Sequence, residues 1–134
     1  MLYHVKGSSP SPKGFATALA KAMGLAMKNG SNQVAIAVPL KGSLDGIVRD
    51  AIGEKAVKTL QKSGGTIRVD DITIFLITDK IRSGFKSGVI VATYVSTKQL
   101  KQLISDYRAT DIVFVPWAEA ELTNYLSANT STSI

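Results

Sequence analysis

Apolar residues recur between residues 12 and 28 at the spacing of one helix face, and polar residues occupy the other side. Pro12 stands at the predicted first turn, where its missing N–H does no harm, and Asn29-Gly30 supplies a C-terminal cap. The apolar stripe consists of Phe15, Leu19, Ala22, Met23, Ala26 and Met27. The pattern predicts one long helix with a single buried face.

Shorter apolar runs without alternation predict strands that are covered on both faces. These runs span residues 34–38, 89–95 and 112–115, and a further short strand is predicted at 2–5. Two runs rich in β-branched residues, 66–69 and 72–77, flank Asp70-Asp71. Because aspartate favours turns, we expect these two runs to form a hairpin.

Helices are predicted between the strands from their caps. Ser96-Thr97-Lys98-Gln99 has the spacing of a capping box, and apolar residues follow it at helical spacing. Ser43 is expected to cap a helix that begins at Leu44 and is broken at Gly53. A last helix is predicted after Pro116.

The order of these elements is that of an α/β fold. Residues 89–126 follow the order β-α-β-α, which is typical of a right-handed parallel crossover. We predict a single three-layer domain of Rossmann-like or flavodoxin-like pattern over residues 1–128. It has helices on both faces of a mostly parallel sheet of about five or six strands, with the hairpin near 66–77. Residues 129–134, rich in Ser and Thr, are predicted to be a flexible tail.

The composition provides a core and excludes several chemistries. Of 134 residues, 45% are hydrophobic and 19% are charged, which suits one folded domain. Cysteine is absent and His4 is the sole histidine, so disulfides, cysteine nucleophiles, thiolate metal sites and multi-histidine metal sites are excluded. No apolar run reaches the roughly 20 residues of a membrane span, and no signal-peptide pattern begins the chain. A cytoplasmic protein without a membrane partner is therefore the default expectation.

The net charge of +6 is unevenly distributed. Residues 1–44 contain no acidic residue but include Lys6, Lys13, Lys21, Lys28 and Lys41. Such lysines either keep a protein in solution or face an anionic partner. Because no helix-turn-helix, zinc-finger or aromatic RNA-binding motif is present, we expect only weak, salt-dependent and non-specific nucleic-acid binding.

The candidate binding residues lie in loops after strands, because ligands of open parallel sheets bind beyond the strands' carboxyl ends. Lys41-Gly42-Ser43 is a predicted anion cradle, since glycine permits close approach and a helix start presents free N–H groups. The alternative is that Gly42 serves the turn and Ser43 merely caps a helix. Trp117, after the last predicted strand, either stacks on a ligand or packs under the final helix.

The loop over residues 79–88 is a second candidate. It carries Lys80, Arg82 and Lys86 beside the aromatic Phe85, a combination that suits phosphate pairing and base stacking. Alternatively, the loop is solvated and Phe85 folds back onto the core. The loop joins two strands without an intervening helix, so one strand could be antiparallel and the loop could lie at the opposite edge.

Signatures of phosphate hydrolysis and of catalysis are weak. Residues 7–14 resemble a phosphate loop only in part, because Lys13 precedes the last glycine and prolines remove backbone donors. No G-x-G-x-x-G occurs. Asp45 or Asp79, near strand ends, could act as a base, a nucleophile or a magnesium ligand. No catalytic or metal-binding residue and no cofactor is assigned.

Three functions remain open. The first is a non-catalytic binding or assembly domain that recognises a phosphate-bearing small molecule or nucleotide. The second is a protein-interaction module, either a homo-oligomer or an accessory subunit, with no small-molecule ligand. The third and weakest is an aspartate-dependent hydrolase or transferase. Fold pattern alone does not separate them.

Overall fold

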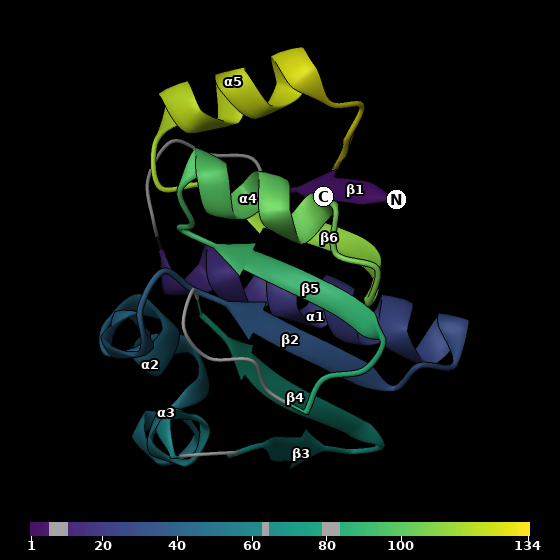
Figure 1. The fold of residues 1–134 in the computed structure, drawn as a ribbon. Helices are drawn as coiled ribbons and strands as arrows, with labels where there is room; N and C mark the ends of the chain where they lie inside the picture. Colours follow the sequence, from purple (N-terminus) through teal and green to yellow (C-terminus); the bar gives the residue numbers. More distant parts are fainter. Residues whose placement is uncertain (6–10, 63–64, 79–83) are drawn as a thin grey trace.

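The computed structural model describes residues 1–5, 11–62, 65–78 and 84–134 (Figure 1). The strands are β1 (Leu2–His4), β2 (Gln33–Ala37), β3 (Ile67–Val69), β4 (Ile72–Ile77), β5 (Gly88–Thr93), β6 (Ala109–Val115) and β7 (Thr132–Ser133). The helices are α1 (Pro12–Asn29), α2 (Ile47–Ile52), α3 (Glu54–Gln61), α4 (Thr97–Ile104) and α5 (Glu119–Ala128), with a short 3-10 helix η1 (Lys41–Leu44).

The strands form one sheet in the order β3-β4-β2-β5-β6-β1-β7. β3 is antiparallel to β4, and every other neighbouring pair is parallel. The predicted α/β fold with a mostly parallel sheet is therefore confirmed. The described part of the chain forms seven strands rather than five or six, and the additional strand is β7.

The additional strand lies within residues 129–134, which were predicted to be a flexible tail. Thr132 and Ser133 pair with Tyr3 and His4 of β1, and the Ile134 N–H donates to the His4 carbonyl at 3.0 Å. Without β7, the outer backbone groups of β1 would remain an open sheet edge. The Ser- and Thr-rich composition predicted a frayed end. The pairing could not be predicted locally, because the partner strand is more than a hundred residues away in the sequence.

β3 and β4 form the predicted hairpin. Ile67 pairs with Ile74, and Val69 pairs with Ile72. Asp70 has a φ of 54°, the left-handed conformation that a tight hairpin turn requires and that aspartate tolerates better than most residues. The hairpin near 66–77 is thus confirmed.

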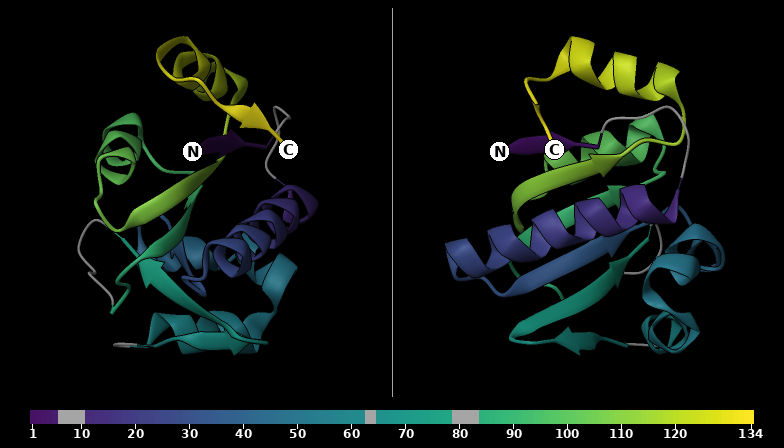
Figure 2. Two further views of the ribbon diagram at one scale, coloured as in Figure 1. Left: turned by 90° about the vertical axis from the view of Figure 1, so that its right-hand side faces the viewer. Right: turned by 180° about the vertical axis from the view of Figure 1, so that it is seen from behind.

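Helices cover both faces of the sheet, which gives the predicted three layers (Figure 2). α1, α2 and α3 pack on one face, whereas α4 and α5 pack on the other. Side chains alternate between the two cores along β2: Val34 and Ile36 join the first core, and Ala35 and Ala37 join the second.

The C-terminal cap of α1 forms as predicted, and Ser11 supplies an N-cap that was not predicted, but the next helix begins later than expected. The Ser11 hydroxyl accepts from the Gly14 N–H at 3.0 Å, and Gly30 ends α1 in the left-handed conformation with φ 80°. Residues 41–44 form η1, and α2 begins only at Ile47. The expected helix from Leu44 is therefore wrong, because the chain first makes a 3-10 turn. Across the residues described, no helix combines the length and apolar character needed to cross a membrane.

Candidate functional site

The strand order reverses between β2 and β5, at the edge where both strands end. After β2 the chain moves toward β4 on the face of α1, and after β5 it moves toward β6 on the face of α4. In open α/β sheets, ligands bind in the crevice outside such a reversal. We call residues 38–43, 94–99 and 116–117 the carboxyl edge. The opposite edge, where these strands begin, is the amino edge.

Gln99 joins the two diverging loops at the carboxyl edge. Its Nε2 donates to the Val38 carbonyl at 3.0 Å, and the residue is only 4% exposed. The first half of the predicted capping box forms, since the Ser96 hydroxyl accepts from the Gln99 N–H at 3.1 Å. The second half does not form, because the Gln99 Oε1 is buried and has no hydrogen-bond partner among the residues that the structure describes. The Val38 carbonyl fixes the orientation of the amide, so the unsatisfied atom is an acceptor that a ligand N–H or O–H would complement.

Tyr94 and Trp117 form an aromatic pair at the same edge. Tyr94 follows β5 directly with a φ of 55°, which is uncommon for a residue other than glycine. Its ring meets the Trp117 ring edge to face, with centroids 5.1 Å apart. The Tyr94 hydroxyl is buried, and no described residue forms a hydrogen bond with it. Burial raises the pKa of Tyr94. Trp117 is 54% exposed, so it does not pack beneath the final helix.

Lys41, Gly42 and Ser43 lie at this edge as well, within η1. The Ser43 hydroxyl accepts from the Leu40 N–H at 3.3 Å, so it closes the start of η1 instead of capping a helix that begins at Leu44. A Cβ on Gly42 would meet no atom within 4 Å, so close packing does not require this glycine. The segment therefore leaves open space beside the strand end, but it offers only one short 3-10 turn as a source of free N–H groups.

Residues 84–88 of the second candidate loop lie at the amino edge, because they lead into β5, which is parallel to β2. The Lys86 N–H donates at 3.0 Å to the side-chain oxygen of Gln33, the first residue of β2. The structure therefore does not bring Lys86 together with Trp117 or with the 41–43 segment. Lys80, Arg82 and Asp79 lie outside the described residues.

Phe85 folds onto the core rather than offering an exposed stacking surface. It is 3% exposed and contacts Phe75, with ring centroids 5.8 Å apart. The Arg108 guanidinium lies 5.5 Å from the Phe85 ring centroid. The alternative in which Phe85 folds back onto the core therefore describes this residue better than base stacking does.

Sequence reasoning missed a polar cluster between β1, β7 and α5. The His4 Nδ1 lies 2.8 Å from the Ser131 hydroxyl, and the Tyr125 hydroxyl donates to the same Ser131 oxygen at 3.1 Å. Burial raises the pKa of Tyr125, and the bond to Ser131 opposes this increase. Because the Ser131 oxygen already accepts a hydrogen bond, we assign the cluster a structural role that holds the chain's last residues to β1. No local signal predicts a contact across 127 positions.

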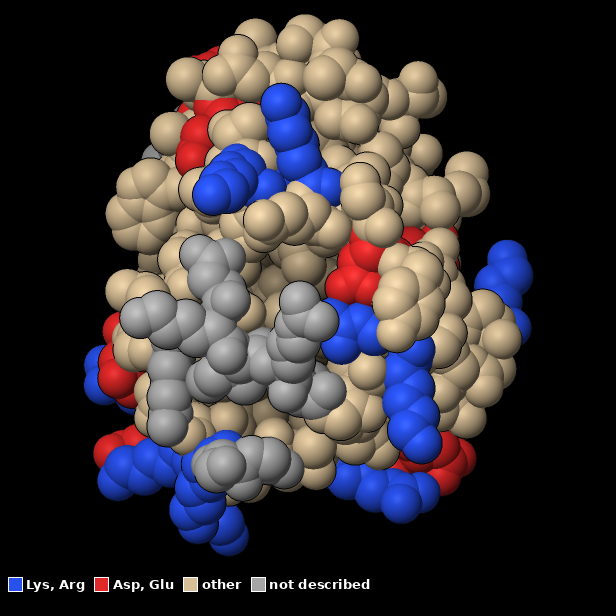
Figure 3. Space-filling view, viewed as in Figure 1, with Lys and Arg blue, Asp and Glu red and all other residues tan. Residues whose placement is uncertain are grey.

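The acidic candidates do not converge in the part of the chain that the structure describes. The Asp45 carboxylate accepts from the Gln61 side-chain amide at 3.2 Å. Among the described residues, no group of three His, Asp or Glu side chains is placed to hold a metal ion. On the face that carries α4 and α5, lysine and arginine side chains are dispersed rather than continuous (Figure 3).

The carboxyl edge thus combines a topological reversal, two unsatisfied buried polar atoms and a half-exposed tryptophan. Comparisons with protein-family models, with curated proteins and with solved structures gave no match to this chain.

Proposed function

We propose that this chain is a binding domain that recognises a phosphate-bearing small molecule at its carboxyl edge, and that a nucleotide is the best chemical fit. The observation that carries the proposal is the Gln99 side chain. Its amide bridges the two diverging loops through the Val38 carbonyl and leaves a buried acceptor without a partner. Natural proteins rarely leave such an atom unsatisfied, and binding sites are where they do so.

A nucleotide supplies three groups that complement this edge. An amine of the base or a ribose hydroxyl would donate to the Gln99 Oε1. The phosphates would accept from the N–H groups of Thr97 and Lys98, which have no carbonyl partner within α4 because they lie in its first turn. The base would stack on Trp117, which is half exposed and fixed by Tyr94.

The test is isothermal titration calorimetry with AMP, IMP, 2′-deoxy-AMP, adenosine and inorganic phosphate. Removing the base amine or the ribose hydroxyl that meets the Gln99 Oε1 should weaken binding about tenfold or more, since a polar site rejects a ligand that leaves it unpaired. This comparison changes only the ligand, so loss of folding cannot explain the outcome.

Protein variants provide a second arm. Trp117→Ala should weaken nucleotide binding about tenfold or more, because stacking is worth roughly 1–3 kcal/mol per base. Tyr107→Ala is the matched control, since Tyr107 is a 94% exposed aromatic at the amino edge. The double substitution Lys41→Ala with Ser43→Ala tests the predicted anion cradle. Absence of nucleotide binding, or binding unchanged in all of these variants, would reject the proposal.

A protein-interaction module is the second candidate, and the exposure of two apolar side chains favours it. Leu40 and Trp117 are 63% and 54% exposed, and both belong to the carboxyl edge. Light scattering across a wide concentration range tests the homo-oligomer version. A monomer throughout would dismiss that version.

A further inference from the structure

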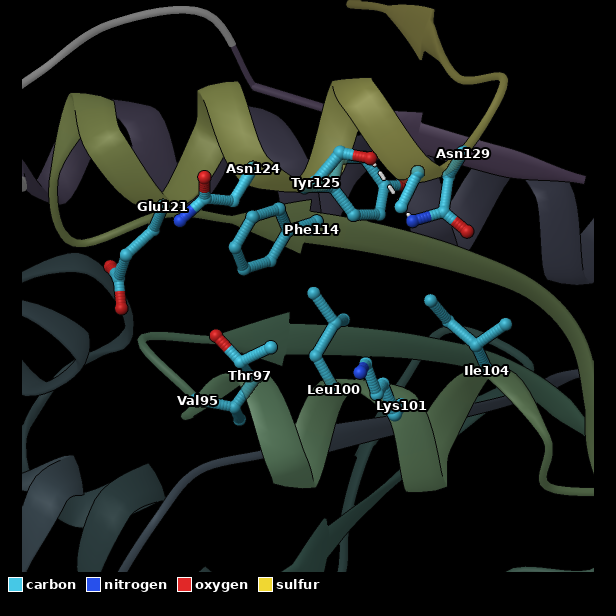
Figure 4. Close-up of a pocket in the computed structure, with 11 residues that line it drawn as sticks. Val95, Thr97, Leu100, Lys101, Ile104, Phe114, Glu121, Asn124, Tyr125 and Asn129 are labelled. Carbon is cyan, nitrogen blue, oxygen red and sulfur yellow. Dashed lines mark hydrogen bonds between the residues drawn. The ribbon is translucent and has the colours of Figure 1, made fainter.

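A groove of about 180 Å³ separates α4 from α5 above β6. Its apolar lining comes from three elements, with Leu100 and Ile104 on α4, Phe114 on β6 and Tyr125 on α5 (Figure 4). Tyr125 is the buried residue of α5, so this helix lies against the sheet through few side chains. The groove is smaller than pockets for drug-sized ligands, which span roughly 300–1,000 Å³. It is close to the roughly 150 Å³ of an apolar cavity that accepts one benzene ring.

One lysine and one glutamate line the groove, and they differ in whether their charged groups already have partners. Lys101 lines the groove and is exposed, and no ion pair found among the described residues involves it. The Glu121 carboxylate accepts from the N–H groups of Trp117 and Ala118 at 3.0 and 3.1 Å. It also lies at the start of α5, where the helix dipole stabilises negative charge. An ammonium group is therefore available to a ligand, whereas the carboxylate is already bound to its own helix.

We propose that this groove binds a small carboxylate with an aromatic or branched aliphatic body. The body contacts Leu100, Ile104 and Phe114, and the carboxylate pairs with the Lys101 ammonium. A groove of this volume accommodates one ring or one branched chain but not a helix of a second protein. The proposed carboxylate contacts use neither Gln99 nor the Tyr94–Trp117 pair. The two proposed sites adjoin at Thr97, which lines the groove and whose N–H is assigned to the nucleotide phosphates.

The experiment is a titration of the full ¹⁵N-labelled chain with phenylacetate, followed by amide chemical shifts. Shifts should concentrate at Leu100, Lys101 and Phe114, with a dissociation constant on the order of 1 mM for so small a ligand. Lys101→Gln should weaken binding roughly tenfold, because a charge-assisted contact is replaced by a neutral one. Lys98→Gln is the matched control, since Lys98 is an exposed lysine of the same helix that does not line the groove.

Two further measurements keep the outcome decisive. Benzylamine, which has the same ring but the opposite charge, should produce no shifts in the groove. Leu100→Phe should fill the groove and remove phenylacetate binding while the circular dichroism spectrum stays native. Equal binding of benzylamine, equal effects of the two lysine substitutions, or no shifts at the groove would overturn the proposal. A dimer that buries these residues would overturn it as well.

Discussion

The two edges of the sheet are built in contrasting ways. At the amino edge, side chains and loops are tied to one another: the Gln33 side-chain oxygen accepts from the Lys86 N–H at 3.0 Å. Arg108 forms a two-point contact with Asp106 at 2.7 and 3.0 Å and donates to the Phe85 carbonyl at 3.3 Å. These contacts hold Phe85 and Lys86 in place just before β5.

The carboxyl edge is less completely satisfied. Within the described residues, three buried side-chain polar atoms lack a partner, and two of them, on Tyr94 and Gln99, belong to this edge. The third, on Ser31, lies just before β2 and so at the amino edge, which gives two such atoms at one edge and one at the other among the described residues. This difference in polar satisfaction is the basis of the proposal that the carboxyl edge binds a ligand, since incomplete polar satisfaction concentrates at functional sites.

The largest expected effect is at Gly88, where β5 begins. A Cβ at this position would lie 2.1 Å from the Gln33 carbonyl oxygen, a clash that only backbone movement can relieve. Gly88→Ala should therefore lower the free energy of unfolding by about 2–4 kcal/mol, measured by urea denaturation. Gly42→Ala at the carboxyl edge is the control and should cost less than about 0.5 kcal/mol, because its Cβ would meet open space. Equal losses in both variants would contradict the difference between the edges.

The contrast between local and distant signals explains which features sequence reasoning predicted. Caps, β-branched runs and the 89–126 alternation are local, so they predicted α1, the hairpin, α4 and the parallel sheet. The direction of the Gln99 side chain is not local, because its partner Val38 lies 61 positions away. The capping-box spacing predicted the hydrogen bond to Ser96 but could not predict that the glutamine would turn away from its own helix.

Which candidate residues lie together was harder to predict than the fold, for the same reason. The edge at which residues 79–88 lie depends on whether β5 is parallel to β2, and this is a property of the whole sheet. Lys86 is therefore separated from Trp117, although both come from loops of suitable composition. Residues 41–43 and Trp117 do share the predicted edge, because each follows a strand whose direction the β-α-β pattern fixes.

A moderate effect is expected at Arg108, which ties the amino edge together. Its pKa is raised mainly by the hydrogen bond to Asp106, with burial acting in the opposite direction, so the guanidinium stays charged. Arg108→Ala should lower the free energy of unfolding by about 2 kcal/mol, because Asp106 loses a two-point contact. Arg108→Lys should recover less than half of this loss, because an ammonium cannot make the planar contact. Full recovery by lysine would show that charge alone holds this edge.

The smallest effect is expected at Tyr94, and it has the opposite sign. Because its hydroxyl is buried and has no hydrogen-bond partner in the described part of the chain, Tyr94→Phe should raise the free energy of unfolding at pH 7 by up to about 1 kcal/mol. Burial raises the pKa of Tyr94 above its ordinary value near 10, so the folded chain keeps the phenol proton longer than the unfolded chain does. The stability linked to this proton is fully present below about pH 10 and is lost as the pH rises through the folded-state pKa. The advantage of Tyr94→Phe over the natural chain should therefore increase above pH 10, in urea titrations repeated at rising pH. The control for this prediction is Tyr107→Phe, at a 94% exposed position of the amino edge, which should leave the alkaline loss of stability unchanged.

If Tyr94→Phe instead destabilises the protein at pH 7, the Tyr94 hydroxyl has a hydrogen-bond partner. The polar atoms of the carboxyl edge are then more fully satisfied than the comparison of the two edges requires.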